Sequence, residues 1–129
     1  MSKRINISSG TEWESHVGYS RAVRVGAIVE VAGTTAVEGD EVLFPHDPYN
    51  QARYILLKIK QALEDSGARI EDVVRTRMYV TDMEHWEEVG KAHGEVFGDI
   101  RPVATMVEVY ALIKEGLVVE IEASAVVSD

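Results

Sequence analysis

The 129-residue sequence contains no cysteine, which excludes disulfide bonds, thiol nucleophiles and thiolate metal sites. Long hydrophobic runs are also missing. No stretch approaches the roughly 20 apolar residues that cross a bilayer, and residues 1–7 have no apolar signal region. We therefore expect a cytoplasmic protein without a membrane partner.

Positive charge is scarce as well. The sequence has 13 Lys and Arg residues against 22 Asp and Glu residues, so the formal net charge is -9. Because nucleic-acid backbones are bound by basic surfaces, a nucleic-acid partner is disfavoured. The histidines have no ligand-like spacing, and there is no phosphate loop, nucleotide fingerprint or Gly-x-Ser-x-Gly motif. We expect neither a metal site nor a cofactor.

What the sequence does contain is typical of a soluble globular protein, with 46% hydrophobic and 27% charged residues. A chain of this length is most simply one domain, residues 1–129, which can bury a core. Its segments follow the order strands, helix, strand, helix, strands. That order predicts an α+β fold.

The first predicted helix begins after Asp47. This residue is suited to cap the first turn, Pro48 to occupy the first helical position and Gly67 to end the helix. Apolar residues recur between them at helical spacing: Ala52, Ile55, Leu56, Ile59, Ala62 and Leu63. This stripe predicts an amphipathic helix with one buried side.

A second helix is predicted to begin at Asp82, extend to about Phe97 and end at Gly98. Both helices need a surface to cover. A mixed sheet of about six strands, with both helices packed on one face, supplies that surface.

The strands are predicted from segments rich in Val, Ile and Thr. They cover residues 3–7, 19–25, 26–33 and 73–81, and two runs on either side of a polar turn at 113–116. We expect these last two runs, within residues 101–127, to form a terminal hairpin. Residues 8–16 are predicted to be a polar turn, and residues 34–46 a hairpin-like or loop connection around Gly39.

Alternate strand positions differ in character. Val74, Thr76, Met78 and Val80 are predicted to share one face of their strand. The opposite face of the sheet is predicted to carry charge: Glu30, Arg75, Arg77, Glu108, Glu120 and Glu122. Carboxylates within apolar strands cost free energy unless they are solvated or partnered. This face is therefore expected to meet water, a ligand or another subunit.

Several motifs, taken in order, resemble one known family. They are Val73-Val-Arg-Thr-Arg-Met-Tyr-Val-Thr-Asp82, Trp86-Glu-Glu-Val89, Pro102, Val107-Glu-Val109 and Val119-Glu-Ile-Glu-Ala123. Each motif alone is weak evidence of family membership. Their order and spacing over almost the whole chain resemble those of the RidA/YjgF family, also called the L-PSP endoribonuclease family. The resemblance implies a chorismate-mutase-like subunit in a homotrimer, with sheets lining a central barrel and small-molecule clefts at the subunit interfaces.

The resemblance also implies an activity, the hydrolysis of 2-enamine or 2-imine acids to 2-oxo acids and ammonia. Glu120 falls on the family's active-site glutamate, and Tyr19 and Gly33 fall on substrate-binding positions. The arginine that holds the substrate carboxylate in the family is replaced by Ala104. Arg101 is a further candidate anion-binding residue near that position.

Each candidate residue has a plainer interpretation. Glu120 is either a cleft carboxylate or part of a solvated strand face, and Tyr19 either stacks on a ligand or fills an interface. Arg101 either binds an anion or is exposed. His93 is either a proton shuttle near neutral pH or a half-buried histidine with its hydrogen bonds satisfied.

Three functions remain open. The first is a RidA-like hydrolase or deaminase that uses Glu120 and a bound water. The second is a non-catalytic trimer that binds a metabolite or a protein partner, which the replacement of the family arginine by Ala104 favours. The third, a ribonuclease or translation inhibitor, follows from the older family name. The acidic charge and the absence of a catalytic histidine pair disfavour it.

Overall fold

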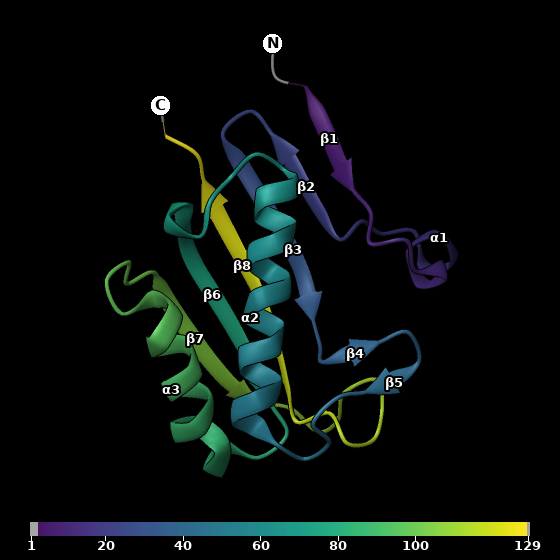
Figure 1. Cartoon of the computed structure of the whole chain (residues 1–129), viewed down its shortest axis with the longest axis vertical. Coiled ribbons are helices and arrows are strands. Elements are labelled where there is room, and N and C mark those ends of the chain that lie inside the picture. The colour runs from purple at the N-terminus through teal and green to yellow at the C-terminus, as the bar shows by residue number, and fades with distance from the viewer. Residues whose placement is uncertain (1–2, 129) are drawn as a thin grey trace.

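A computed structural model describes residues 3–128, so residues 1, 2 and 129 of the expected domain lie outside the described residues. Six strands form one mixed sheet in the order β1 (Arg4–Ile7), β2 (Ala22–Val25), β3 (Ile28–Thr34), β8 (Val119–Val126), β6 (Val73–Val80) and β7 (Val103–Glu108). The helices α2 (Pro48–Asp65) and α3 (Trp86–Phe97) lie side by side on one face of this sheet (Figure 1). The predicted α+β architecture is confirmed.

Smaller elements complete the chain. They are α1 (Glu12–Val17), the strands β4 (Val37–Glu38) and β5 (Glu41–Val42), and two 3-10 turns at Ile70–Asp72 and Met83–His85. The β4–β5 pair is the hairpin predicted around Gly39. In Figure 1, α1 and this hairpin lie on the side of the molecule away from α3. They border the pocket described below.

The α2 helix forms as its sequence predicts. The Asp47 side chain accepts a hydrogen bond from the Asn50 backbone N at 3.1 Å, Pro48 occupies the first turn, and Gly67 follows the last turn with φ 85°. All six residues of the apolar stripe are buried, and each of the four Ile and Leu side chains among them contributes about 1.5–3 kcal/mol of transfer free energy. Within residues 3–128, no helix is both long and apolar enough to span a membrane.

The predicted terminal hairpin is wrong. β7 pairs in parallel with β6, and β8 runs antiparallel between β3 and β6. The α3 helix provides the crossover that a parallel pair requires. The connection after β7 is held by the buried Gln51 side chain, which donates to the Gly116 carbonyl at 2.9 Å and accepts from the Val118 N at 2.9 Å. Two β-rich runs beside a turn do not reveal that β6 lies between them and pairs with both.

Two strand faces also differ from the prediction. A register shift between Val73 and Arg75 turns Val74 outward, so that it is exposed rather than facing the core with Thr76. In β7, Glu108 is in register with the buried Val80 and therefore lies on the helix side of the sheet, not on the open face. Its carboxylate instead accepts a hydrogen bond from the Met83 N at 2.8 Å. The prediction that Glu108 belongs to the charged open face is therefore wrong.

Residues 8–16 are not only a polar turn, because α1 forms within and just after them and ends at Gly18 with φ 92°. The reason is Glu14, whose buried carboxylate accepts hydrogen bonds from the backbone N and hydroxyl of Ser9 and from the Thr11 hydroxyl. These bonds tie the preceding loop to the helix. As a result, Trp13 and Tyr19 are held beside the end of β3.

Candidate functional site

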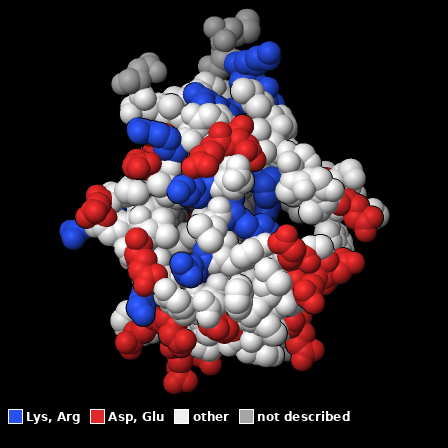
Figure 2. Space-filling model, in the orientation of Figure 1, with Lys and Arg blue, Asp and Glu red and all other residues white. Residues whose placement is uncertain are grey.

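An open pocket of about 410 Å³ lies where β3 leaves the sheet toward β4. Its walls come from α1 and the segment after it, the end of β3, the β4–β5 hairpin, α2, the connection before β8, and β8 itself. Figure 2 shows the surface hollowed between α1 and the body of the molecule, with Lys and Arg side chains along the body side of the hollow. The side chains that carry chemistry there are Tyr19, Arg21, Lys58, Lys114 and Glu120.

Glu120 enters this pocket across Gly33. The β8 residues Val119 and Ile121 are buried in the core, so the intervening Glu120 points to the open face of the sheet. A Cβ atom built on Gly33 would lie 2.1 Å from Glu120 Oε2. Glycine in β3 therefore leaves the space that the carboxylate occupies. The register between β3 and β8 shifts between Val31 and Thr34, which places Gly33 in an irregular part of the strand.

The electrostatic environment of Glu120 favours its protonated form. Burial raises the pKa of Glu120 above its ordinary value, the positive charge of Arg21 opposes this rise, and the negative charge of Glu122 adds to it. None of the side chains that the structure describes donates a hydrogen bond to it. Glu122, two residues on, accepts from the Tyr79 hydroxyl at 2.8 Å and lies 3.5 Å from Arg77 Nη1. Of these two carboxylates, Glu120 is the one available to a ligand.

Arg21 is a pocket residue that sequence reasoning missed. Its Nη2 donates to the Gly33 carbonyl at 2.9 Å, and its guanidinium carbon lies 5.8 Å from the centre of the Tyr19 ring. Its buried Nε has no acceptor among residues 3–128. The available signal was the spacing of Tyr19 and Arg21, because alternate residues of an extended segment share one face.

Lys58 is the second cation and comes from the flank of α2. Its Nζ donates to the Val37 carbonyl at 3.2 Å and lies 5.5 Å from the centre of the Tyr54 ring. Burial lowers the pKa of Lys58, the nearby charge of Arg21 lowers it further, and Glu38 opposes both. The helical pattern placed Lys58 outside the apolar stripe but could not show that it borders a pocket.

Comparison with known proteins identifies the family. The family model described as Endoribonuclease L-PSP matches residues 10–127. The chain belongs to the RidA/YjgF family. A Streptomyces coelicolor relative, SCO2049, is 38% identical over 119 residues, covering 92% of this chain and 89% of its own.

Two solved structures superpose closely on this chain. Rv2704 of Mycobacterium tuberculosis, described as a member of the YjgF/YER057c/UK114 family, is 55% identical with a TM-score of 0.87, covering 97% of this chain and 100% of that one. TdcF of Escherichia coli, solved with bound serine, is 26% identical with a TM-score of 0.77 over 85% of this chain and 88% of its own. The fold is therefore that of the RidA/YjgF proteins.

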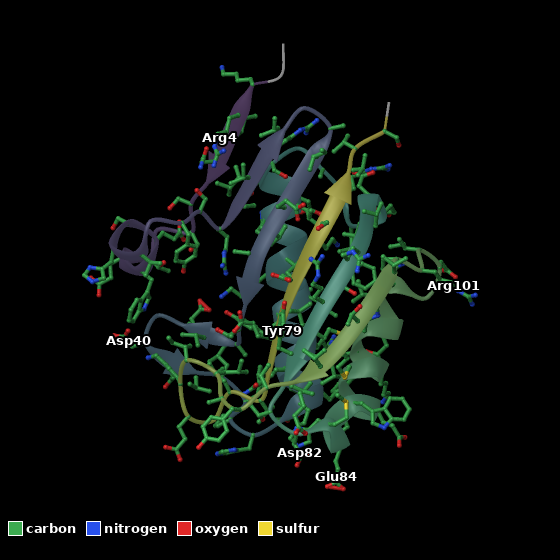
Figure 3. All side chains as sticks on the ribbon, turned by 180° about the vertical axis from the view of Figure 1, so that it is seen from behind. Arg4, Asp40, Tyr79, Asp82, Glu84 and Arg101 are labelled. Atoms are coloured by element: carbon green, nitrogen blue, oxygen red, sulfur yellow. The ribbon has the colours of Figure 1, made fainter. Side chains whose placement is uncertain are left out.

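Three candidates from the sequence lie outside the pocket lining. Arg101 is exposed beyond the β7 end of the sheet, on the far side from the β4–β5 hairpin that carries Asp40 (Figure 3). Ala104, at the family arginine position, is exposed on the edge strand β7. His93 in α3 lies 2.8 Å from the Thr76 hydroxyl, and burial lowers the pKa of its ring. Tyr19, Gly33 and Glu120 are the predicted residues that this chain brings together.

The raised pKa of Glu120 makes a prediction about stability and pH in this RidA/YjgF chain. The folded state binds the Glu120 proton more tightly than the unfolded state, so stability falls as pH rises from the ordinary carboxyl pKa of 4.5 through the higher folded value. In Glu120→Gln this loss is absent. We expect the variant to match the wild type in acid and to be the more stable protein at neutral pH, as measured by urea unfolding across that range. A stability advantage that is constant with pH would contradict the assignment.

Proposed function

We propose that this protein is a RidA-like hydrolase that converts small 2-imino or 2-enamine acids to 2-oxo acids and ammonia at the Glu120 pocket. The observation that carries the proposal is Glu120 itself. It is a half-buried carboxylate with a raised pKa, free of hydrogen bonds from the described side chains, in a pocket with cations. A raised pKa brings a carboxyl group closer to neutral pH, where it accepts and returns protons more readily than an ordinary carboxyl group does.

The reaction requires only water and proton transfer. Glu120 accepts a proton from a water molecule as the water oxygen forms a bond to the iminium carbon. The same proton then moves to the nitrogen. As the carbon–nitrogen bond breaks and ammonia leaves, Glu120 takes the proton of the new hydroxyl group so that the carbonyl forms, and it then releases this proton to ammonia or solvent. An enamine first takes a proton at its β-carbon from the protonated Glu120 carboxyl to become the iminium ion, which leaves Glu120 ionised for the attack of water. Each step uses a carboxyl group that can exist in both protonation states, which the environment of Glu120 favours.

A small carboxylate-bearing ligand is consistent with the comparisons. The structural relative TdcF was solved with bound serine, which is a small amino acid with one carboxylate. The acidic net charge of -9 disfavours RNA as the substrate despite the family description.

The proposal includes a homotrimer. Val103 and Val107 on the open face of β7 are 57% and 42% exposed, and β7 is an edge strand. A neighbouring copy would cover these side chains and add a wall to the pocket. Sedimentation of the purified protein should show three chains in one particle. A monomer at the concentration used for the assay would contradict this assembly.

The test of the activity is direct. An amino-acid oxidase that acts on alanine generates 2-iminopropionate in the assay mixture, and pyruvate formation is followed with and without the protein. We expect the rate of pyruvate appearance to rise above the spontaneous rate in proportion to protein concentration. Several imino acids hydrolysed no faster than in buffer would overturn the proposal.

Ala104 favours a second candidate function, a non-catalytic trimer that binds a metabolite. The arginine expected at this position in the family is absent. If Ala104→Arg hydrolyses imino acids and the wild type does not, the natural protein is a binder or acts on another substrate. Turnover by the wild type excludes that alternative.

A further inference from the structure

The geometry points to Arg21 and Lys58 as the site that binds the carboxylate of the ligand, supplied by the same chain that supplies Glu120. This inference rests on the proposed function only in placing the anion in the same pocket as Glu120. The ligand class is a small monocarboxylate, such as a 2-oxo or 2-imino acid. The site would take the place of the arginine that is missing at Ala104.

The first observation concerns Arg21 and Lys58, two of the three cationic side chains that line the pocket. The charges of Arg21 and Glu120 affect each other, as do those of Lys58 and Glu38, but neither cation forms an ion pair with a carboxylate that the structure describes. Among residues 3–128, the ion pairs join Arg69 with Asp72 and Arg77 with Glu122, so neither Arg21 nor Lys58 takes part. Both line the pocket although the chain carries 22 acidic residues. Two like charges facing one partly buried space repel each other, and an anion between them removes that cost.

The second observation is the position of the guanidinium relative to Glu120. Arg21 Nη2 is bonded to the carbonyl of Gly33, the residue over which the Glu120 carboxylate lies. Arg21 Nη1 donates to the Thr34 hydroxyl at 3.4 Å and Nε is buried, so an anion would use the second N–H groups of Nη1 and Nη2. An anion held there would place the adjacent carbon of a small ligand next to Glu120. Arginine suits this task because its planar guanidinium binds a carboxylate through paired hydrogen bonds.

The third observation is the restraint on both cations. The Arg21 side chain is held by Gly33 and by the Tyr19 ring, and Lys58 by the Val37 carbonyl. Long cationic side chains that are already ordered lose less conformational entropy when an anion binds. The site is thus preorganised for a carboxylate rather than assembled by it.

Binding can be measured without turnover. Trp13 lines the pocket, so its fluorescence in a Trp86→Phe background reports occupancy. The probe is 2-oxobutyrate, and 2-butanone is its uncharged counterpart. We expect 2-oxobutyrate to bind with an affinity that falls at least about tenfold in Arg21→Gln and less in Lys58→Gln, because a hydrogen bond to a charged group contributes about 1.5–3 kcal/mol. Binding of 2-butanone should be equally weak in all proteins.

Matched controls remove the same charges from the exposed surface of α2. Arg53→Gln and Lys60→Gln should bind 2-oxobutyrate as the wild type does. Arg21→Lys keeps the charge and loses the planar fork, so we expect an intermediate affinity. If Arg21→Gln fails to fold, Arg21→Lys and Lys58→Gln provide the test in its place.

The outcomes separate this inference from the proposed function. Wild-type affinity for 2-oxobutyrate in folded Arg21 and Lys58 variants, or no 2-oxobutyrate binding by the wild type, overturns the inference even if imines are hydrolysed. If 2-oxobutyrate binding depends on Arg21 but no imine is hydrolysed, the proposed function is overturned and the anion site is supported.

Discussion

Glu120→Gln should lower the turnover number for 2-iminopropionate hydrolysis by about two to four orders of magnitude, the usual contribution of a positioned acid–base group. Glutamine keeps the shape of the side chain but can neither accept nor deliver the proton that water addition requires. The loss should appear mainly in kcat, because the Arg21 and Lys58 contacts to the substrate remain. Initial rates of pyruvate formation over a range of imine concentrations give kcat and KM separately.

The matched control for this prediction is Glu30→Gln. Glu30 lies on the same open face of the sheet, where it is exposed and accepts a hydrogen bond from the Ser124 hydroxyl at 2.5 Å. Its replacement removes the same charge without entering the pocket lining. Comparable rates for Glu120→Gln and wild type would show that another group moves the proton.

Gly33→Ala should reduce turnover by about 100-fold while leaving the fold intact. The added Cβ would lie 2.1 Å from Glu120 Oε2 and 3.1 Å from its carboxyl carbon, so the carboxylate must swing away from its position. Misplacement of a reacting group by about an ångström costs about 100-fold in rate. The backbone tolerates alanine because Gly33 is not among the residues with positive φ. Steady-state rates measure the loss of turnover, and thermal unfolding of the same preparation shows whether the fold is intact.

Gly94→Ala provides the comparison for this change. Gly94 lies on the exposed surface of α3, and an added Cβ meets nothing within 4 Å. The control should keep full activity and gain roughly 0.5–1 kcal/mol of stability, since alanine suits a helix better than glycine. Full activity in Gly33→Ala would show that the Glu120 carboxylate does not need its observed position.

The elements of the fold were largely predictable. For α2, the capping carboxylate, the proline, the apolar stripe and the terminal glycine all act within a turn or two of the chain. The pairing of the strands was harder to predict from the sequence. The runs before and after residues 113–116 look like a hairpin, yet each pairs with β6 on opposite sides. The outward turn of Val74 arises from a register shift against β8, to which the alternation of its own strand gives no clue.

The candidate site was predictable only in part. The family resemblance pointed to Tyr19, Gly33 and Glu120, which line one pocket. It also directed attention to the region of Ala104 and Arg101 for an anion-binding group, and neither residue lines that pocket. Arg21 and Lys58 were overlooked because one lies in an ordinary strand-like segment and the other on the flank of a helix.

Composition, capping signals and periodicity were sufficient to indicate the class of fold, the position of α2 and the strand that carries Glu120. These properties depend on residues that are close together in the chain. The partners of each strand, the space above Gly33 and the meeting of Arg21 with Lys58 depend on contacts between distant segments. Such contacts form only when α2 and β8 pack against β3, and so they were visible only in the folded chain.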